Sequence, residues 1–279
     1  MNQDTLKLLR LAKGFLGSED DFKAVRILRK LIKEKRGDHY PAEWLAELYF
    51  KRKEWKPALY YAQSAFDASE KKESLNYIIG IAGTAGGKVK LADKAWEALD
   101  VFEQDWKGIY VGLYYQTYKE KKIYRAEMIS PCLARVSSIP FPSSTLCVGD
   151  IVLFDRRGTG SAFSEEENIE IYPFLDRQKR SFYKVFSCRL EPCTLSEFRM
   201  LMYLCQRNQV FFDVWSNTTV HFLGSKKQKN PEIYLGLVDA NAGKSHYIAL
   251  AGQRKVDILK VLLDWKGITH KSYDLLRKH

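Results

Sequence analysis

Two short glycine–lysine stretches are the first places where this chain could bind a phosphate group. Residues Ala242–Ser245 read Ala-Gly-Lys-Ser, and Gly86–Lys88 read Gly-Gly-Lys. A phosphate-binding loop also needs an early glycine for close backbone approach and a hydroxyl after the lysine for magnesium. The early position is Val238 in the first stretch and Ala82 in the second, and Val89 follows the second lysine. We therefore interpret both stretches as turn or helix-contact glycines, and we expect no cofactor.

A thiol nucleophile is the second chemistry that the residue types permit. The run Gly149–Phe154 (GDIVLF) resembles the same run in papain-like cell-wall hydrolases, where a cysteine opens a helix well before it and a histidine follows on a strand. Here Cys132 follows Pro131 directly and precedes the run by a short interval, and no histidine lies between His39 and His221. The resemblance therefore lacks its catalytic pair, because a nucleophile must lie within hydrogen-bond reach of its base.

The remaining cysteines give no firmer active site. Cys193 with His221 and Asp213 is a second, equally arbitrary set of a nucleophile, a base and an acid. Cys188 and Cys193 are five positions apart, but no second cysteine or histidine pair at ligand spacing accompanies them, so we expect no metal site. We assign no catalytic residue and interpret the buried thiols as small hydrophobic groups, which favours a protein that is not an enzyme.

Basic and aromatic residues alternate in the second half of the chain, around Arg180, Phe182 and Lys184. Exposed aromatic rings beside arginine or lysine can stack the bases of single-stranded nucleic acid. The net charge of +11 agrees with an acidic partner. Alternating aromatic residues also line protein cores, so both interpretations stay open. The predicted nucleic-acid contacts are Arg156, Arg157, Arg177, Lys179, Arg180, Lys226 and Lys227.

Composition limits the class of protein. The 279 residues are 46% hydrophobic, which suffices for one large or two medium domains with buried cores. No run of 18 apolar residues occurs, so we expect no membrane partner, and the first residues do not read as a signal peptide. The cysteines are odd in number and irregularly spaced, which is typical of reduced thiols and predicts a cytoplasmic protein.

The first third of the chain contains an internal repeat that must position any binding surface there. Small residues recur 34 positions apart in two columns, and an apolar column precedes the first of them. The columns are Ala12, Ala46 and Gly80; Ala24, Ala58 and Ala92; and Leu11, Leu45 and Ile79. Small side chains let two helices cross closely, so the period predicts three helix–turn–helix units.

The repeat resembles the tetratricopeptide repeat (TPR) family over residues 5–106. It departs from the family pattern because the proline at the repeat end is missing and Gly83 replaces the aromatic residue found at Phe15 and Tyr49. The resemblance implies a concave groove for a protein or peptide partner, and hence a non-enzymatic adaptor as the leading function. The matching positions include Lys13, Tyr40, Glu43, Glu47, Phe50, Tyr77, Ile81 and Thr84. The alternative function is a nucleic-acid-binding or nucleic-acid-processing protein, whose working part is the basic C-terminal domain.

The domain boundary follows from where the helical period ends. Ala126 continues the second small-residue column, but Pro131 falls where a helix would have to continue. We predict a capping helix over Asp105–Lys122, a helical domain over residues 1–122 and a second domain over residues 123–279.

The second domain is expected to be a mostly antiparallel α+β domain, because strand-like runs alternate there with helices and turns. Thr194 and Glu197 predict a capping box at the start of a helix. Residues Ile233–Val238 and His246–Ala251 read as a hairpin, and Ser272–Lys278 as a terminal helix. The polar, glycine-containing stretch Arg156–Asn168 reads as a long loop.

Overall fold

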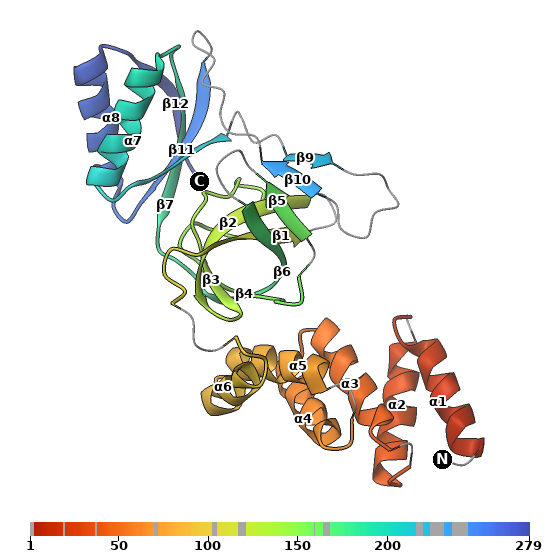
Figure 1. Cartoon of the computed structure of the whole chain (residues 1–279). Coiled ribbons are helices and arrows are strands. Elements are labelled where there is room, and N and C mark those ends of the chain that lie inside the picture. Colours follow the sequence, from red (N-terminus) through yellow and green to blue (C-terminus); the bar gives the residue numbers. More distant parts are fainter. Residues whose placement is uncertain are drawn as a thin grey trace. The chain divides into compact units, whose positions relative to one another are not determined.

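The computed structural model describes residues 3–18, 20–36, 38–69, 72–101, 105–116, 121–158, 160–163, 168–215, 220–223, 232–235 and 245–279. The chain divides into one unit over Met1–Asp105 and another over Trp106–His279, and each is considered by itself. The first unit is helical and the second combines strands with helices (Figure 1), so the fold class is α+β as predicted. Among the described helices, none combines the length and apolar character that a bilayer crossing requires.

The first unit is a series of short helices in which each helix contacts the next. The helices are α1 (Gln3–Phe15), α2 (Asp21–Lys33), α3 (Tyr40–Lys51), α4 (Trp55–Phe66), α5 (Lys72–Ala85) and α6 (Val89–Glu97). The small residues of both repeat columns are buried. At Gly80, an added Cβ atom would lie 2.6 Å from the ring of Trp96, so the helices α5 and α6 cross where no side chain fits.

The predicted capping helix is wrong, because Tyr110–Gln116 forms strand β1. Its residues Val111, Leu113 and Tyr115 face the core of the second unit, whereas the side chains of Tyr110, Tyr114 and Gln116 are more exposed. A period of two residues specifies a strand, whereas the sequence interpretation weighed only one helical face. The two units accordingly divide after Asp105, earlier than the predicted boundary at residue 122.

A closed sheet forms the first part of the second unit. Its strands are β1, β2 (Lys121–Ser130), β3 (Leu133–Val136), β4 (Ile151–Phe154), β5 (Gly160–Phe163), β6 (Asn168–Lys179), β9 (Val220–Leu223) and β10 (Glu232–Leu235). The order β1-β2-β3-β4-β6 returns to β1, because β1 and β6 pair in parallel.

Part of the predicted Arg156–Asn168 loop is strand β5, and its residues 159 and 164–167 lie outside the described residues.

A second sheet carries the last helices of the chain. It contains β7 (Lys184–Leu190), β8 (Phe211–Val214), β11 (His246–Gly252) and β12 (Tyr273–Lys278), in the antiparallel order β12-β7-β11-β8. Helices α7 (Leu195–Arg207) and α8 (Lys255–Thr269) lie side by side on one face of this sheet (Figure 1). The order β7-α7-β8-β11-α8-β12 is a split βαβ arrangement.

Two predictions about strands β10, β11 and β12 are wrong. The expected hairpin does not form, because β10 pairs with β5 and β9 whereas β11 pairs with β7 and β8. The expected terminal helix over Ser272–Lys278 is strand β12, which lies against the edge of β7. Both errors arise from long-range pairing, which local sequence patterns do not report.

The two faces of the second sheet bury different side chains. Phe186, Cys188 and Leu190 of β7 pack against the two helices. Val185 of β7 and Ala249 of β11 pack on the other side, in a cluster with Trp215 and residues from the loops of the closed sheet. The indole of Trp215 donates to the carbonyl of Ile139 across a distance of 2.9 Å. The two sheets are therefore joined by a buried interface inside the second unit.

The predicted capping box at α7 is confirmed. Thr194 Oγ1 accepts from the backbone N–H of Glu197 at 3.3 Å, and the Glu197 carboxylate accepts from the backbone N–H of Thr194 at 2.6 Å.

The Thr194→Ala variant is expected to lower the free energy of unfolding by about 1 kcal/mol, because one first-turn N–H loses its partner. Chemical denaturation measures the loss, and Ser196→Ala, an exposed neighbour in the same turn, should change stability by less than about 0.5 kcal/mol. Equal losses in the two variants would contradict a role for the cap.

Candidate anion-binding site

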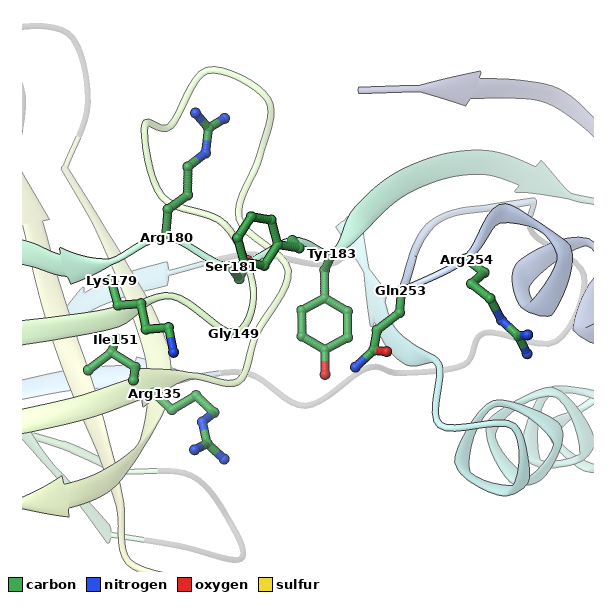
Figure 2. Close-up of a pocket in the computed structure, with 10 residues that line it drawn as sticks. Arg135, Gly149, Ile151, Lys179, Arg180, Ser181, Tyr183, Gln253 and Arg254 are labelled. Carbon is green, nitrogen blue, oxygen red and sulfur yellow. The ribbon is translucent and has the colours of Figure 1, made fainter.

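A row of three side chains crosses adjacent strands of the closed sheet. Arg135 on β3 lies opposite Ile151 on β4, and Ile151 lies opposite Lys179 on β6. Directly opposed residues of antiparallel strands point to the same face of the sheet. Arg135 and Lys179 therefore flank Ile151 on one face, and both side chains extend into the same space (Figure 2).

The turn before β4 holds the next part of the site in place. Gly149 has a φ of +83°, a conformation that L side chains rarely adopt. The Asp150 carboxylate is fully buried and accepts from the backbone N–H groups of Cys147 at 2.9 Å and Ser181 at 2.7 Å. Ser181 Oγ also donates to the carbonyl of Val148 at 2.6 Å. The segment that connects β6 to β7 is thus fixed on the Gly149–Asp150 turn.

That connecting segment presents one packed ring and one exposed ring. The Tyr183 ring occupies the place of the missing Gly149 side chain, since an added Cβ would lie 2.7 Å from it. The ring also packs edge-on against Phe211, with ring centroids 5.0 Å apart, and against the cluster that contains Val148 and Val185. Phe182, by contrast, is 87% exposed, the largest exposed fraction among the large hydrophobic side chains in the described residues. An aromatic ring this exposed is available for stacking.

The opposite wall comes from the second sheet, where Gln253 and Arg254 precede helix α8 (Figure 2). The Arg254 guanidinium donates to both carboxylate oxygens of Asp257, at 2.7 and 3.0 Å. These hydrogen bonds hold the pKa of Asp257 below its usual range and raise the pKa of Arg254. The charge of Arg254 is therefore largely balanced within α8.

Together these elements enclose a pocket of about 550 Å³ with a strong excess of positive charge. The described lining contains Arg135, Lys179, Arg180 and Arg254, and no aspartate or glutamate. Within the described residues, Arg135, Lys179 and Arg180 form no ion pair with a carboxylate. Three uncompensated cations in one hollow favour a multiply charged anion as the ligand.

The predicted nucleic-acid contacts coincide with this pocket in part. Lys179 and Arg180 line it, whereas Lys226 and Lys227 lie outside the described residues. The other three arginines are engaged elsewhere: Arg157 with Asp155, Arg156 with the carbonyl of Pro131 and the Trp106 ring, and Arg177 with the carbonyl of Thr145 and the Asp150 carboxylate. Arg177 thus supports the turn beneath the pocket.

Two cationic residues of the pocket were missed in the sequence. Arg135 is the one charged residue of the predicted strand Leu133–Ile139, and a charge in the middle of a strand indicates a face turned away from the core. Arg254 gave no such signal, because its place in the pocket depends on how the second sheet packs against the closed sheet.

The predicted partner groove lies on α1, α3 and α5. Lys13 and Tyr40 are exposed; Glu47, Tyr77 and Thr84 are half-buried; Glu43, Phe50 and Ile81 are buried. The Glu43 carboxylate accepts from Ser69 Oγ at 3.0 Å, and the Phe50 ring packs edge-on against Trp55. Much of the expected aromatic groove is therefore internal packing.

The cysteines lie apart from the pocket, except that Cys147 belongs to its supporting turn. All five are free, and burial raises the pKa of Cys188 and of Cys205 to about 12. These two thiols are therefore protonated at neutral pH and are poor nucleophiles. For the Cys193, His221 and Asp213 set, the side chain of His221 lies outside the described residues.

A partly buried polar group joins His279, which follows β12, to strands β7 and β11 of the second sheet. Ser187 Oγ lies 2.7 Å from Tyr247 Oη and 2.7 Å from His279 Nε2. Ser187 is fully buried on β7, so the group is a structural network between β7, β11 and the residue that follows β12.

This network predicts a dependence of stability on pH. Burial, followed by the charge of Arg277, lowers the pKa of His279 below its ordinary value of 6.5. The neutral imidazole therefore stabilises the folded chain above about pH 6.5, and this contribution is lost as the pH falls through the lowered pKa. The difference in melting temperature between the native chain and His279→Gln should shrink between pH 7.5 and pH 5. A difference that grows on acidification would contradict this sign.

Comparisons with known proteins add little to this geometry. No family model matches the chain, and no curated protein matches it. A solved structure described as "Novel crystal structure of a hypothetical protein from Neisseria gonorrhoeae" aligns with 62% of this chain and 95% of its own, at 11% identity. Its TM-score of 0.26 carries no argument about fold or function.

Proposed function

We propose that the second unit binds single-stranded nucleic acid at the cationic pocket, as a non-enzymatic binding module. The observation that carries the proposal is the pairing of uncompensated cations with an exposed ring. Arg135, Lys179 and Arg180 supply positive charge for phosphate groups, and Phe182 beside them is 87% exposed. A cationic groove with an aromatic platform is the arrangement that binds single strands without strong sequence preference.

A single strand fits this site better than a duplex does. In a duplex the bases are stacked on one another, so the ring of Phe182 would have no base face to contact. In a single strand each base offers a free face, and Gln253 on the opposite wall adds an amide that can donate and accept hydrogen bonds.

The pocket is also the better candidate surface within the second unit. In RNA-recognition modules built on a four-stranded sheet, aromatic residues of the open sheet face stack the bases. In this chain that face is covered, because Val185, Ala249 and Trp215 pack there against the closed sheet. A ligand would have to approach from the side, where the pocket lies.

Fluorescence anisotropy with a labelled 20-nucleotide single strand tests the proposal. Binding should weaken steeply with salt, because phosphate contacts release counterions. A duplex of the same length should bind more weakly at the same salt concentration. Equal affinity for heparin, the duplex and the single strand would indicate only a general attraction between a basic protein and polyanions.

We also propose that residues 5–106 form a TPR-like array that recruits a protein partner. The supporting observation is that the two small-residue columns with a constant 34-residue period are buried at helix contacts, including Ala12, Ala46 and Ala58 at 0% exposure, although Leu11 of the apolar column is 51% exposed. An array of this kind would bring a partner protein to the nucleic acid held by the second unit, which combines the adaptor and nucleic-acid interpretations of the sequence.

A further inference from the structure

The helical unit contains a separate hollow of about 410 Å³ between α4, α5 and α6. Apolar side chains of all three helices line it, among them Phe66, Ile79 and Leu91. The volume lies within the range of on the order of 300–1,000 Å³ that is usual for ligand sites. The hollow lacks the charge excess of the cationic pocket, because its lining includes one acid, Asp67, and one base, Lys94.

One polar side chain in this hollow has no partner. Asn76 of α5 is only 7% exposed, and within the described residues its carboxamide makes no hydrogen bond. The carboxamide atoms are open to the hollow, because they are not among the fully enclosed side-chain atoms that lack a partner in the described residues. A ligand in the hollow would supply hydrogen bonds to this amide in place of water.

The chemistry of the hollow specifies the ligand. A carboxamide offers both a donor and an acceptor, which match the carbonyl and N–H of a peptide main chain. The apolar lining suits one aliphatic or aromatic side chain. We infer that this hollow binds an extended peptide segment of a partner protein, with its main chain on Asn76 and one apolar side chain against Ile79 and Leu91. The inference rests on the proposal that the helical unit recruits a protein, and it names the site.

This site differs from the groove that the repeat resemblance implies. The groove positions Tyr77 and Ile81 are one helical turn apart on α5, whereas Asn76 and Ile79 lie on another face of the same helix. Variants of the two surfaces can therefore be separated.

Two substitutions test the site from opposite directions. Asn76→Leu replaces the unpartnered carboxamide by an apolar group of similar size, so the melting temperature should stay the same or rise. Ala98→Leu adds bulk at the exposed end of the hollow, at the C-cap of α6, with little effect on folding. Lys90→Ala, exposed on α6 and outside the lining, is the matched control.

The full chain is used to select binders from a phage library of random 12-residue peptides, and the enriched peptides are synthesised for titration. We expect enriched peptides to share an apolar residue, and to bind Asn76→Leu and Ala98→Leu at least tenfold more weakly than the native chain or Lys90→Ala.

Peptides that bind all four proteins equally would overturn the site but leave recruitment by the helical unit standing. A lowered melting temperature of Asn76→Leu with normal binding by Ala98→Leu would make Asn76 a structural residue. No enrichment over an unrelated control protein would overturn recruitment of a peptide as well.

Discussion

Changing Arg135 and Lys179 together to glutamine is expected to weaken binding of a single-stranded 20-mer by about ten- to a hundredfold at low salt. Both side chains belong to the cross-strand row that flanks Ile151, and within the described residues neither forms an ion pair with a carboxylate. Each lost phosphate contact should also reduce the slope of log affinity against log salt by about 1. Anisotropy titrations at several salt concentrations measure both quantities.

The control for this variant removes the same charge elsewhere. Arg199→Gln with Lys260→Gln lowers the net charge equally on the exposed faces of α7 and α8, outside the pocket lining. It should lose far less affinity than the pocket variant. Equal losses would mean that total charge, rather than the pocket, governs binding.

The Gly149→Ala variant is expected to be the most destabilising single change at the site. Gly149 has φ +83°, which costs an alanine about 1–2 kcal/mol, and the new Cβ would lie 2.7 Å from the Tyr183 ring, which adds about 1–3 kcal/mol. Displacement of Tyr183 would also move Arg180 and Phe182, so nucleic-acid binding should weaken in the fraction that stays folded.

The Gly158→Ala variant separates the cost of a positive φ from the cost of the close contact with Tyr183. Gly158 has a similar φ of +72°, but its nearest neighbour for an added Cβ is an atom of Tyr172 at 3.8 Å, an ordinary contact. Chemical denaturation of both variants should give a smaller loss for Gly158→Ala, without loss of binding. Equal losses in stability would show that the close packing of Tyr183 on Gly149 contributes nothing.

Local signals in the sequence predicted the parts of the fold that depend on local geometry. The capping box at Thr194 was predicted because both of its partners lie within one helical turn. The cluster around Arg180 and Phe182 was visible because basic and aromatic residues follow one another in the chain.

Long-range pairing limited the rest of the prediction. The residues of strand β1 alone favour a helix, because its pairing with β2 and β6 is invisible in them. Local residues do not predict strand β12, because its place at the edge of β7 depends on residues far away in sequence. The sequence does not predict Arg254 as a pocket residue for the same reason, because its position in the lining depends on the packing of the second sheet against the closed sheet.

The most direct measurement is photo-crosslinking of the full chain to a single-stranded oligonucleotide that carries 5-iodouridine, followed by mass-spectrometric mapping of the crosslinked residue. The proposal predicts a main crosslink at Phe182 or Tyr183, which Arg135→Gln with Lys179→Gln reduces in yield. Crosslinks that map to the helical unit, or to α7 and α8, and that persist in the pocket variant would contradict nucleic-acid binding at the cationic pocket.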